Sequence, residues 1–106
     1  EKTGYVIDTH TAVAAGVYGK YKKDTGDVDT KTVIASTASP FKFCASVLDA
    51  LGVTEHAPGT GVLAQLTAET GRSAPGPLAS LAGKALRFDQ VTDKAAMRTV
   101  VTEFLR

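Results

Sequence analysis

The feature that most constrains the fold is a short apolar run, residues 32–35 (TVIA), set between two helical patterns. Its β-branched residues and polar boundaries are typical of a strand buried on both faces, as in a parallel sheet. The run leads into residues 36–40 (STASP), where Ser39 fits a helix N-cap and Pro40 the first helical position. Helix, strand and helix within about fifty residues are typical of an α/β protein, which is the fold class that we predict.

The strand is predicted to lie between two amphipathic helices. The first covers residues 10–23, with Asp8 or Thr9 as its N-cap, because either side chain has an oxygen that accepts a backbone N–H of the first turn. Gly16 and Gly19 inside this helix each cost about 1 kcal/mol relative to alanine, so they indicate either a close neighbouring element or simple tolerance. The expected apolar faces are Val13, Val17 and Tyr21 in the first helix, and Cys44, Val47, Leu48 and Leu51 in the second.

The second half of the chain carries weaker patterns. Helices are predicted over residues 60–70 and 78–82, and a last helix begins after the capping pair Thr92-Asp93. A short strand or an extended segment is predicted over residues 86–88. The whole chain is therefore expected to be a helix-strand-helix piece of a single α/β domain, followed by further helices and one short strand.

The composition argues against several classes of function. A net charge of +1, with lysines and arginines spread along 106 residues, provides no basic surface for nucleic acid. One cysteine and two histidines are too few for a structural zinc site, and no stretch approaches the roughly 18 apolar residues of a membrane span. Because Cys44 has no second cysteine to pair with, the chain fits a reducing compartment. We expect a cytoplasmic protein without metal, membrane or nucleic-acid partners.

The end of the predicted strand is where we expect chemistry. Small polar side chains and backbone N–H groups that converge between a strand end and a helix start often bind an anionic ligand. Residues 36–39 have such side chains, although serine and threonine before a proline usually serve only as a cap. Lys42, in the first turn of the second helix, is a candidate for binding a phosphate group, although a lysine there is more often simply solvated.

Two blocks of the sequence resemble a known family. They are GYVIDTHTAV, residues 4–13, and TVIASTASPFKF, residues 32–43. Their order and separation resemble the C-terminal part of threonine synthases, which are pyridoxal-phosphate enzymes of fold type II. The family often has proline where this chain has Thr9. The likeness is strong over residues 3–51 and thinner beyond, so residues 1–106 are similar to a C-terminal fragment of a threonine synthase.

The resemblance implies roles for individual residues. Thr37 corresponds to the hydroxyl that hydrogen-bonds the pyridine nitrogen of pyridoxal phosphate, with Ser36 as the alternative one position earlier. Asp8 and His10 become candidates for lining the pocket or orienting neighbours, and Lys42 for contacting the substrate phosphate. The other interpretation remains open, in which Asp8 is only a helix cap and His10 a partly buried residue of the first turn.

The resemblance also implies an activity that this chain does not complete. Threonine synthases convert O-phosphohomoserine and water into threonine and phosphate, and both their Schiff-base lysine and their cofactor-phosphate cup lie upstream of such a segment. No convincing counterpart of either is present here, so we assign no catalytic residue and expect the chain alone to be inactive and largely free of cofactor. Because the chain begins at Glu1 rather than methionine, we expect a fragment whose partner is the N-terminal region of the same enzyme.

Two other interpretations come from different classes of protein. One is a free-standing α/β module that binds a small anion at residues 36–42, and the other is a purely structural or oligomerisation domain. A parallel strand without its sheet would expose two hydrogen-bonding edges as well as an apolar helix face. We therefore also predict that the chain self-associates.

Overall fold

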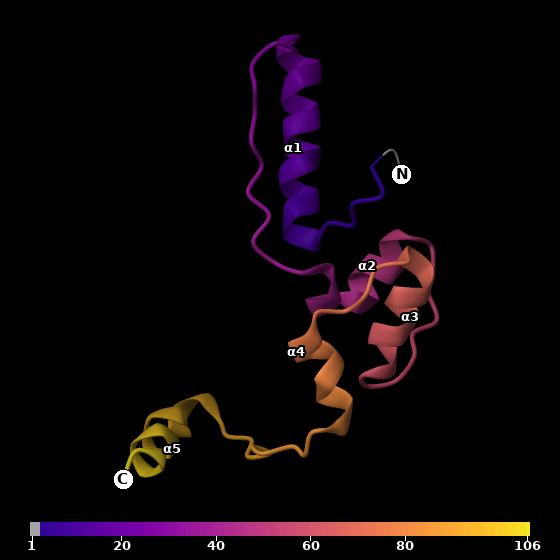
Figure 1. Cartoon of the computed structure of the whole chain (residues 1–106). Coiled ribbons are helices and arrows are strands. Elements are labelled where there is room, and N and C mark those ends of the chain that lie inside the picture. Colours follow the sequence, from indigo (N-terminus) through magenta and orange to yellow (C-terminus); the bar gives the residue numbers. More distant parts are fainter. Residues whose placement is uncertain (1–2) are drawn as a thin grey trace.

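The computed structural model describes residues 3–106, and it is built of helices joined by extended segments (Figure 1). The longest helix is α1, and shorter helices and 3₁₀ turns follow it along the chain. In chain order they are α1 (Thr9–Thr25), η1 (Pro40–Lys42), α2 (Cys44–Ala50), α3 (Gly61–Thr70), α4 (Gly76–Ala79), η2 (Ser80–Gly83), η3 (Lys94–Ala96) and α5 (Met97–Phe104).

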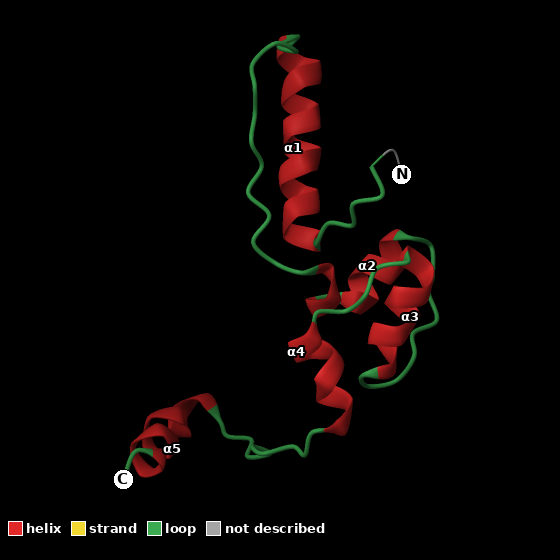
Figure 2. Cartoon of the chain, viewed as in Figure 1, coloured by secondary structure: helices red, strands yellow, loops and turns green. Residues whose placement is uncertain are grey.

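The predicted α/β fold is wrong for this chain, because residues 3–106 contain no strand (Figure 2). Residues 32–35 run as an extended but unpaired segment, and the side chain of Val33 is 95% exposed. The short strand predicted over residues 86–88 is likewise absent, and Leu86 and Phe88 are exposed. A strand requires a neighbouring strand to pair its N–H and C=O groups, and the described chain provides none.

Helix α1 forms where the sequence predicts it, but its apolar face is not covered. Asp8 is the N-cap, and Gly26 ends the helix in the left-handed conformation with a φ of 72°. A methyl group added at Gly16 or Gly19 would meet nothing within 4 Å, so no described residue packs closely against these glycines. The predicted apolar face, made of Val13, Val17 and Tyr21, is exposed.

The core lies where α2 packs against α3. Cys44, Val47 and Leu48 of the predicted α2 face are buried, while Leu51 at the end of that face is 53% exposed. Leu66 of α3 is fully buried against them. Phe41 completes this core from η1, whose N-cap is Ser39 and whose first residue is the predicted proline.

The chain buries little of its surface. It exposes 8651 Å², whereas a compact monomer of its mass would expose roughly 5,600 Å². Its radius of gyration is 19.1 Å against about 13 Å for a compact domain of this length. Helices α1 and α5 project away from the core in opposite directions (Figure 1). The self-association predicted for this chain stays a prediction: residues 3–106 contain no strand edge, and the predicted apolar face of α1 is exposed.

Candidate functional site

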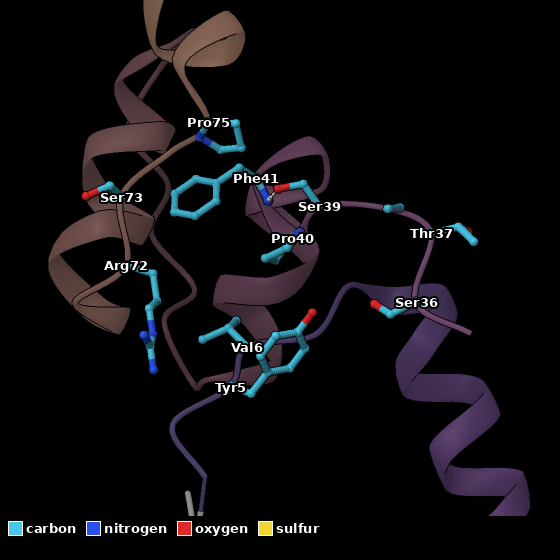
Figure 3. Close-up of a pocket in the computed structure, with 11 residues that line it drawn as sticks. Tyr5, Val6, Ser36, Thr37, Ser39, Pro40, Phe41, Arg72, Ser73 and Pro75 are labelled. Atoms are coloured by element: carbon cyan, nitrogen blue, oxygen red, sulfur yellow. Dashed lines mark hydrogen bonds between the residues drawn. The ribbon is translucent and has the colours of Figure 1, made fainter. Parts of the chain in front are cut away.

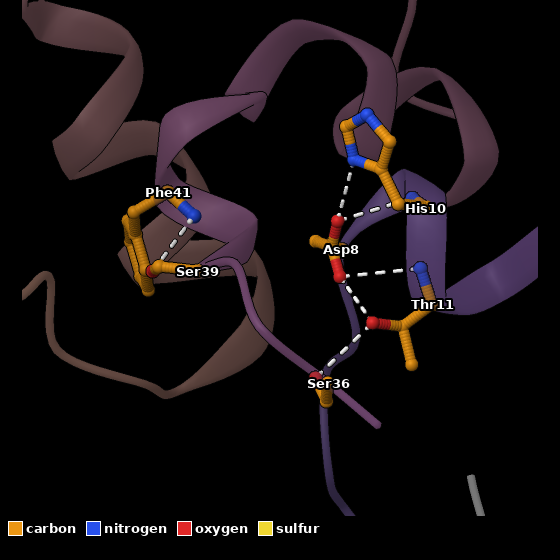
Figure 4. Close-up of polar contacts among 6 residues, drawn as sticks. All are labelled: Asp8, His10, Thr11, Ser36, Ser39 and Phe41. Atoms are coloured by element: carbon orange, nitrogen blue, oxygen red, sulfur yellow. Dashed lines mark hydrogen bonds and ion pairs between the residues drawn. The ribbon is translucent and has the colours of Figure 1, made fainter. Parts of the chain in front are cut away.

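Asp8 is the centre of a network of hydrogen bonds at the start of α1 (Figure 4). Its side chain is only 1% exposed, and each carboxylate oxygen accepts two hydrogen bonds. Oδ2 accepts from the backbone N–H of His10 at 3.0 Å and from its ring Nδ1 at 2.8 Å. Oδ1 accepts from the backbone N–H of Thr11 at 3.3 Å and from the Thr11 hydroxyl. This arrangement satisfies the buried carboxylate and begins the helix.

A second contact links this network to the predicted site 25 residues further along. The hydroxyl oxygens of Thr11 and Ser36 lie 3.1 Å apart. A hydroxyl has one proton, and the Asp8 carboxylate only accepts, so we assign the Thr11 proton to Asp8 and the bridging proton to Ser36. Asp8 thereby holds the extended segment before η1 against the start of α1.

The same contacts lower the pKa of Asp8 to about 2 from its usual 3.8. The hydrogen bond from the Thr11 hydroxyl is the main cause, and bonds from His10 and the backbone add to it, while burial acts in the opposite direction. Asp8 is therefore ionised at neutral pH. Its role in the described structure is to anchor neighbouring groups.

We expect the stability of this region to depend on pH through Asp8. Because the folded pKa lies below the unfolded one, the stabilisation is complete above about pH 4 and is lost as the pH falls toward about 2. Asp8→Asn preserves a capping oxygen but not the charge, so it should destabilise the chain at neutral pH and differ little from wild type near pH 2. Urea unfolding followed by circular dichroism measures this, with the exposed Asp89→Asn as control. An equal loss for Asp8→Asn at both pH values would contradict the role of the charge.

An open pocket of about 430 Å³ lies beside this network (Figure 3). Three segments that are distant in sequence form it: Tyr5 and Val6 before α1, residues 36–41, and residues 72–75 after α3. Hydroxyl groups and aromatic rings dominate its lining. A volume of this size suits a small ligand.

The structure brings some of the predicted site residues together and leaves others apart. Ser36 and Thr37 line the pocket and are exposed. Asp8 is linked to Ser36 indirectly, because Thr11 is hydrogen-bonded to both residues. His10 does not line it; its ring packs edge-on against Phe43 at 5.0 Å between centroids. Lys42, the last residue of η1, is exposed and lies outside the lining.

Tyr5 and Arg72 are among the pocket residues that sequence patterns missed. Arg72 follows Gly71, which ends α3 with a φ of 65°. Its guanidinium donates to the carbonyl oxygen of Gly4, which is 68 residues away. A local sequence pattern cannot predict a contact between residues 68 positions apart. Arg72 is therefore recognised as a pocket residue only from the tertiary structure.

Comparison with known families decides the identity of the chain. A family model described as threonine synthase, C-terminal, matches residues 11–101. The chain belongs to this family. The match includes both Thr37 and Arg72, whereas Asp8 and His10 lie just before it. Comparisons with curated proteins and with solved structures give no significant match.

Membership in the threonine synthase family raises the question of whether the pocket suits pyridoxal phosphate. The lining includes the hydroxyl residues Ser36 and Thr37 and the aromatic residues Tyr5 and Phe41, which are residue types that suit a substituted pyridine ring. No lysine among residues 3–106 lines it, so these residues provide no group for a Schiff base.

Two further findings concern other kinds of site. Within residues 3–106, no three side chains of histidine, cysteine, aspartate or glutamate gather closely enough to hold a metal ion. None of the helices in this range combines the length and the apolar character that crossing a membrane requires.

Proposed function

We propose that this chain is the C-terminal part of an enzyme that converts O-phosphohomoserine and water into threonine and phosphate. The family match over residues 11–101 carries this proposal, since the family belongs to threonine biosynthesis. The enzyme would be a pyridoxal-phosphate-dependent lyase of the cytoplasm. The pocket beside residues 36–39 supports the proposal, because Ser36 and Thr37 line it and are exposed.

In this proposal, the chain supplies one wall of the cofactor pocket. When bound, pyridoxal phosphate supplies an electron sink for the substrate carbon atoms. The Thr37 hydroxyl faces the pyridine nitrogen, and a neutral partner leaves that nitrogen largely uncharged. Ser36 is held by Thr11 and Asp8, which makes Asp8 a positioning residue rather than a ligand. The roles of Lys42 and His10 as substrate ligands stay predictions. Neither residue lines the pocket, which gives these two roles no support.

The lysine that binds the cofactor is proposed to lie in the N-terminal region of the same enzyme. The large exposed surface of the chain supports this, because roughly 3,000 Å² more is exposed than in a compact monomer of this mass. A second polypeptide surface is needed to cover it. The large exposed surface also makes a free-standing anion-binding module the weaker candidate, because such a module would need to be compact by itself.

The test compares this chain with the longer gene product that contains it. We expect the gene product to bind pyridoxal phosphate, seen in its absorbance, and to release phosphate from O-phosphohomoserine. The chain alone should do neither, and it should sediment as a species larger than its 11.0 kDa mass because its exposed face associates.

Two results would contradict the proposal. Tight binding of the cofactor by the chain alone would show that its pocket is complete. A gene product that binds the cofactor but releases no phosphate from O-phosphohomoserine would have another substrate.

A further inference from the structure

Among residues 3–106, Arg72 is the charged residue that lines the pocket. It lies at the opposite end of the pocket from Thr37 (Figure 3). Within residues 3–106, no carboxylate is within ion-pair distance of its guanidinium, and no acidic side chain lines the pocket. The Asp8 carboxylate accepts hydrogen bonds from His10 and Thr11 and does not contact Arg72. The pocket therefore has a positive end without an internal counter-charge.

The guanidinium is held in place by the backbone of Gly4. Nε and Nη2 of Arg72 donate to the Gly4 carbonyl oxygen at 3.1 and 2.5 Å. Gly4 has a φ of 62°, and a Cβ atom at this position would lie 3.1 Å from Nη2 of Arg72. Both the backbone conformation and the space beside it thus favour glycine. The contact fixes one edge of the guanidinium.

The other edge remains available for a ligand. A guanidinium has five N–H donors, and the two bonds to Gly4 leave the donors of Nη1 and one of Nη2. These form the fork that binds a carboxylate or a phosphate through two parallel hydrogen bonds. Ser39 also lines the pocket, and its hydroxyl accepts from Phe41 N–H, which leaves its own proton to donate.

We propose that Arg72 binds an oxyanion group of the substrate, while Thr37 at the other end of the pocket faces the cofactor ring. This inference rests on the proposed function, in which the substrate is a phosphorylated amino acid. Such a substrate carries two groups of the required chemistry, its phosphate and its carboxylate. The site binds one of them through the Nη1–Nη2 edge of Arg72 and leaves the reacting carbon atoms toward Thr37.

The test uses the full gene product with bound cofactor and measures two quantities. One is the KM for O-phosphohomoserine, and the other is the dissociation constant of inorganic phosphate, obtained by calorimetry. Arg72→Gln removes the charged fork and should raise the KM about 10- to 100-fold, the usual weight of a charged hydrogen-bonded contact. Arg72→Lys preserves the charge without the fork and should recover only part of this loss. Arg87→Gln, an exposed arginine beside Phe88, is the matched control and should leave both quantities unchanged.

The phosphate measurement distinguishes the two groups of the substrate. Weaker binding of inorganic phosphate by Arg72→Gln assigns the phosphate group to Arg72. The alternative result is that Arg72→Gln leaves phosphate binding unchanged but raises the KM and weakens the inhibition of the enzyme by homoserine. That result assigns the carboxylate of the substrate to Arg72. Gly4→Ala preserves the arginine but displaces its guanidinium, so it should show the same defect in a weaker form. Circular dichroism and the cofactor absorbance establish that each variant is folded and loaded.

The outcomes separate this inference from the proposed function. An active gene product whose KM and phosphate affinity are unchanged in Arg72→Gln overturns the role of Arg72 and leaves the function standing. A gene product that does not turn over O-phosphohomoserine, but whose phosphate binding depends on Arg72, overturns the function and leaves the oxyanion site standing. A KM that rises equally in Arg72→Gln and Arg87→Gln reflects a general charge effect and overturns the site.

Discussion

Replacing Leu48 by alanine should destabilise the chain by about 2–5 kcal/mol, the usual cost of removing a buried leucine side chain. Leu48 is 0% exposed and lies in a core that comprises five buried apolar side chains among residues 3–106. It packs among Val47 and Cys44 of its own helix and Leu66 of α3. A chain of this size is stable by only about 5–15 kcal/mol even when compact, so this loss removes a large part of the total.

Urea unfolding followed by far-ultraviolet circular dichroism measures the effect. The rate at which a thiol reagent labels Cys44 gives a second, local readout, because this buried thiol should become reactive when α2 separates from α3. Leu51→Ala is the matched control, since Leu51 ends the same helix but is 53% exposed. Equal losses for the two variants would mean that the core does not lie between α2 and α3.

The second large effect is expected at Thr37, in the gene product with bound cofactor. Thr37→Val preserves the shape but removes the hydroxyl, which should lower kcat about 10-fold, the weight of one lost hydrogen bond. Thr37→Asp places a carboxylate at the same point, which favours a protonated pyridine nitrogen and should lower kcat about 100-fold. It should also shift the absorbance of the cofactor, whereas Thr37→Val should shift it less.

The matched control is Thr32→Val, an exposed threonine in the same extended segment but outside the pocket lining. It should leave kcat and the cofactor absorbance unchanged. If Thr37→Asp alters neither quantity, Thr37 does not face the pyridine nitrogen, and Ser36 becomes the residue to test in the same way.

Local patterns predicted the boundaries of the helices well. Asp8, one of the two predicted N-caps of α1, and the Ser39-Pro40 start of η1 both follow from the conformations and side-chain bonds of a few neighbouring residues. The buried face of α2 also follows, because its spacing places Cys44, Val47 and Leu48 on one side. These features depend on residues within one or two turns of each other.

The predicted strands failed for the opposite reason. Residues 32–35 have the composition of a buried strand, but a strand exists only when another segment pairs with it. The same holds for the apolar face of α1, where Val17 is 63% exposed although its spacing predicts burial. Composition indicates that a residue suits an interior, and it does not establish that a neighbour is present to form one.

The amino-acid sequence alone determined the family and the start of η1 at Ser39 and Pro40, and it predicted Ser36 and Thr37 as site residues. These follow from ordered motifs and from contacts between near neighbours. The tertiary arrangement alone showed that Asp8 reaches Ser36 through Thr11 and that Arg72 meets Gly4 across 68 residues. Such contacts depend on the path of the whole chain, because the orientation of a charged side chain toward a pocket is set by packing and not by its position in a motif.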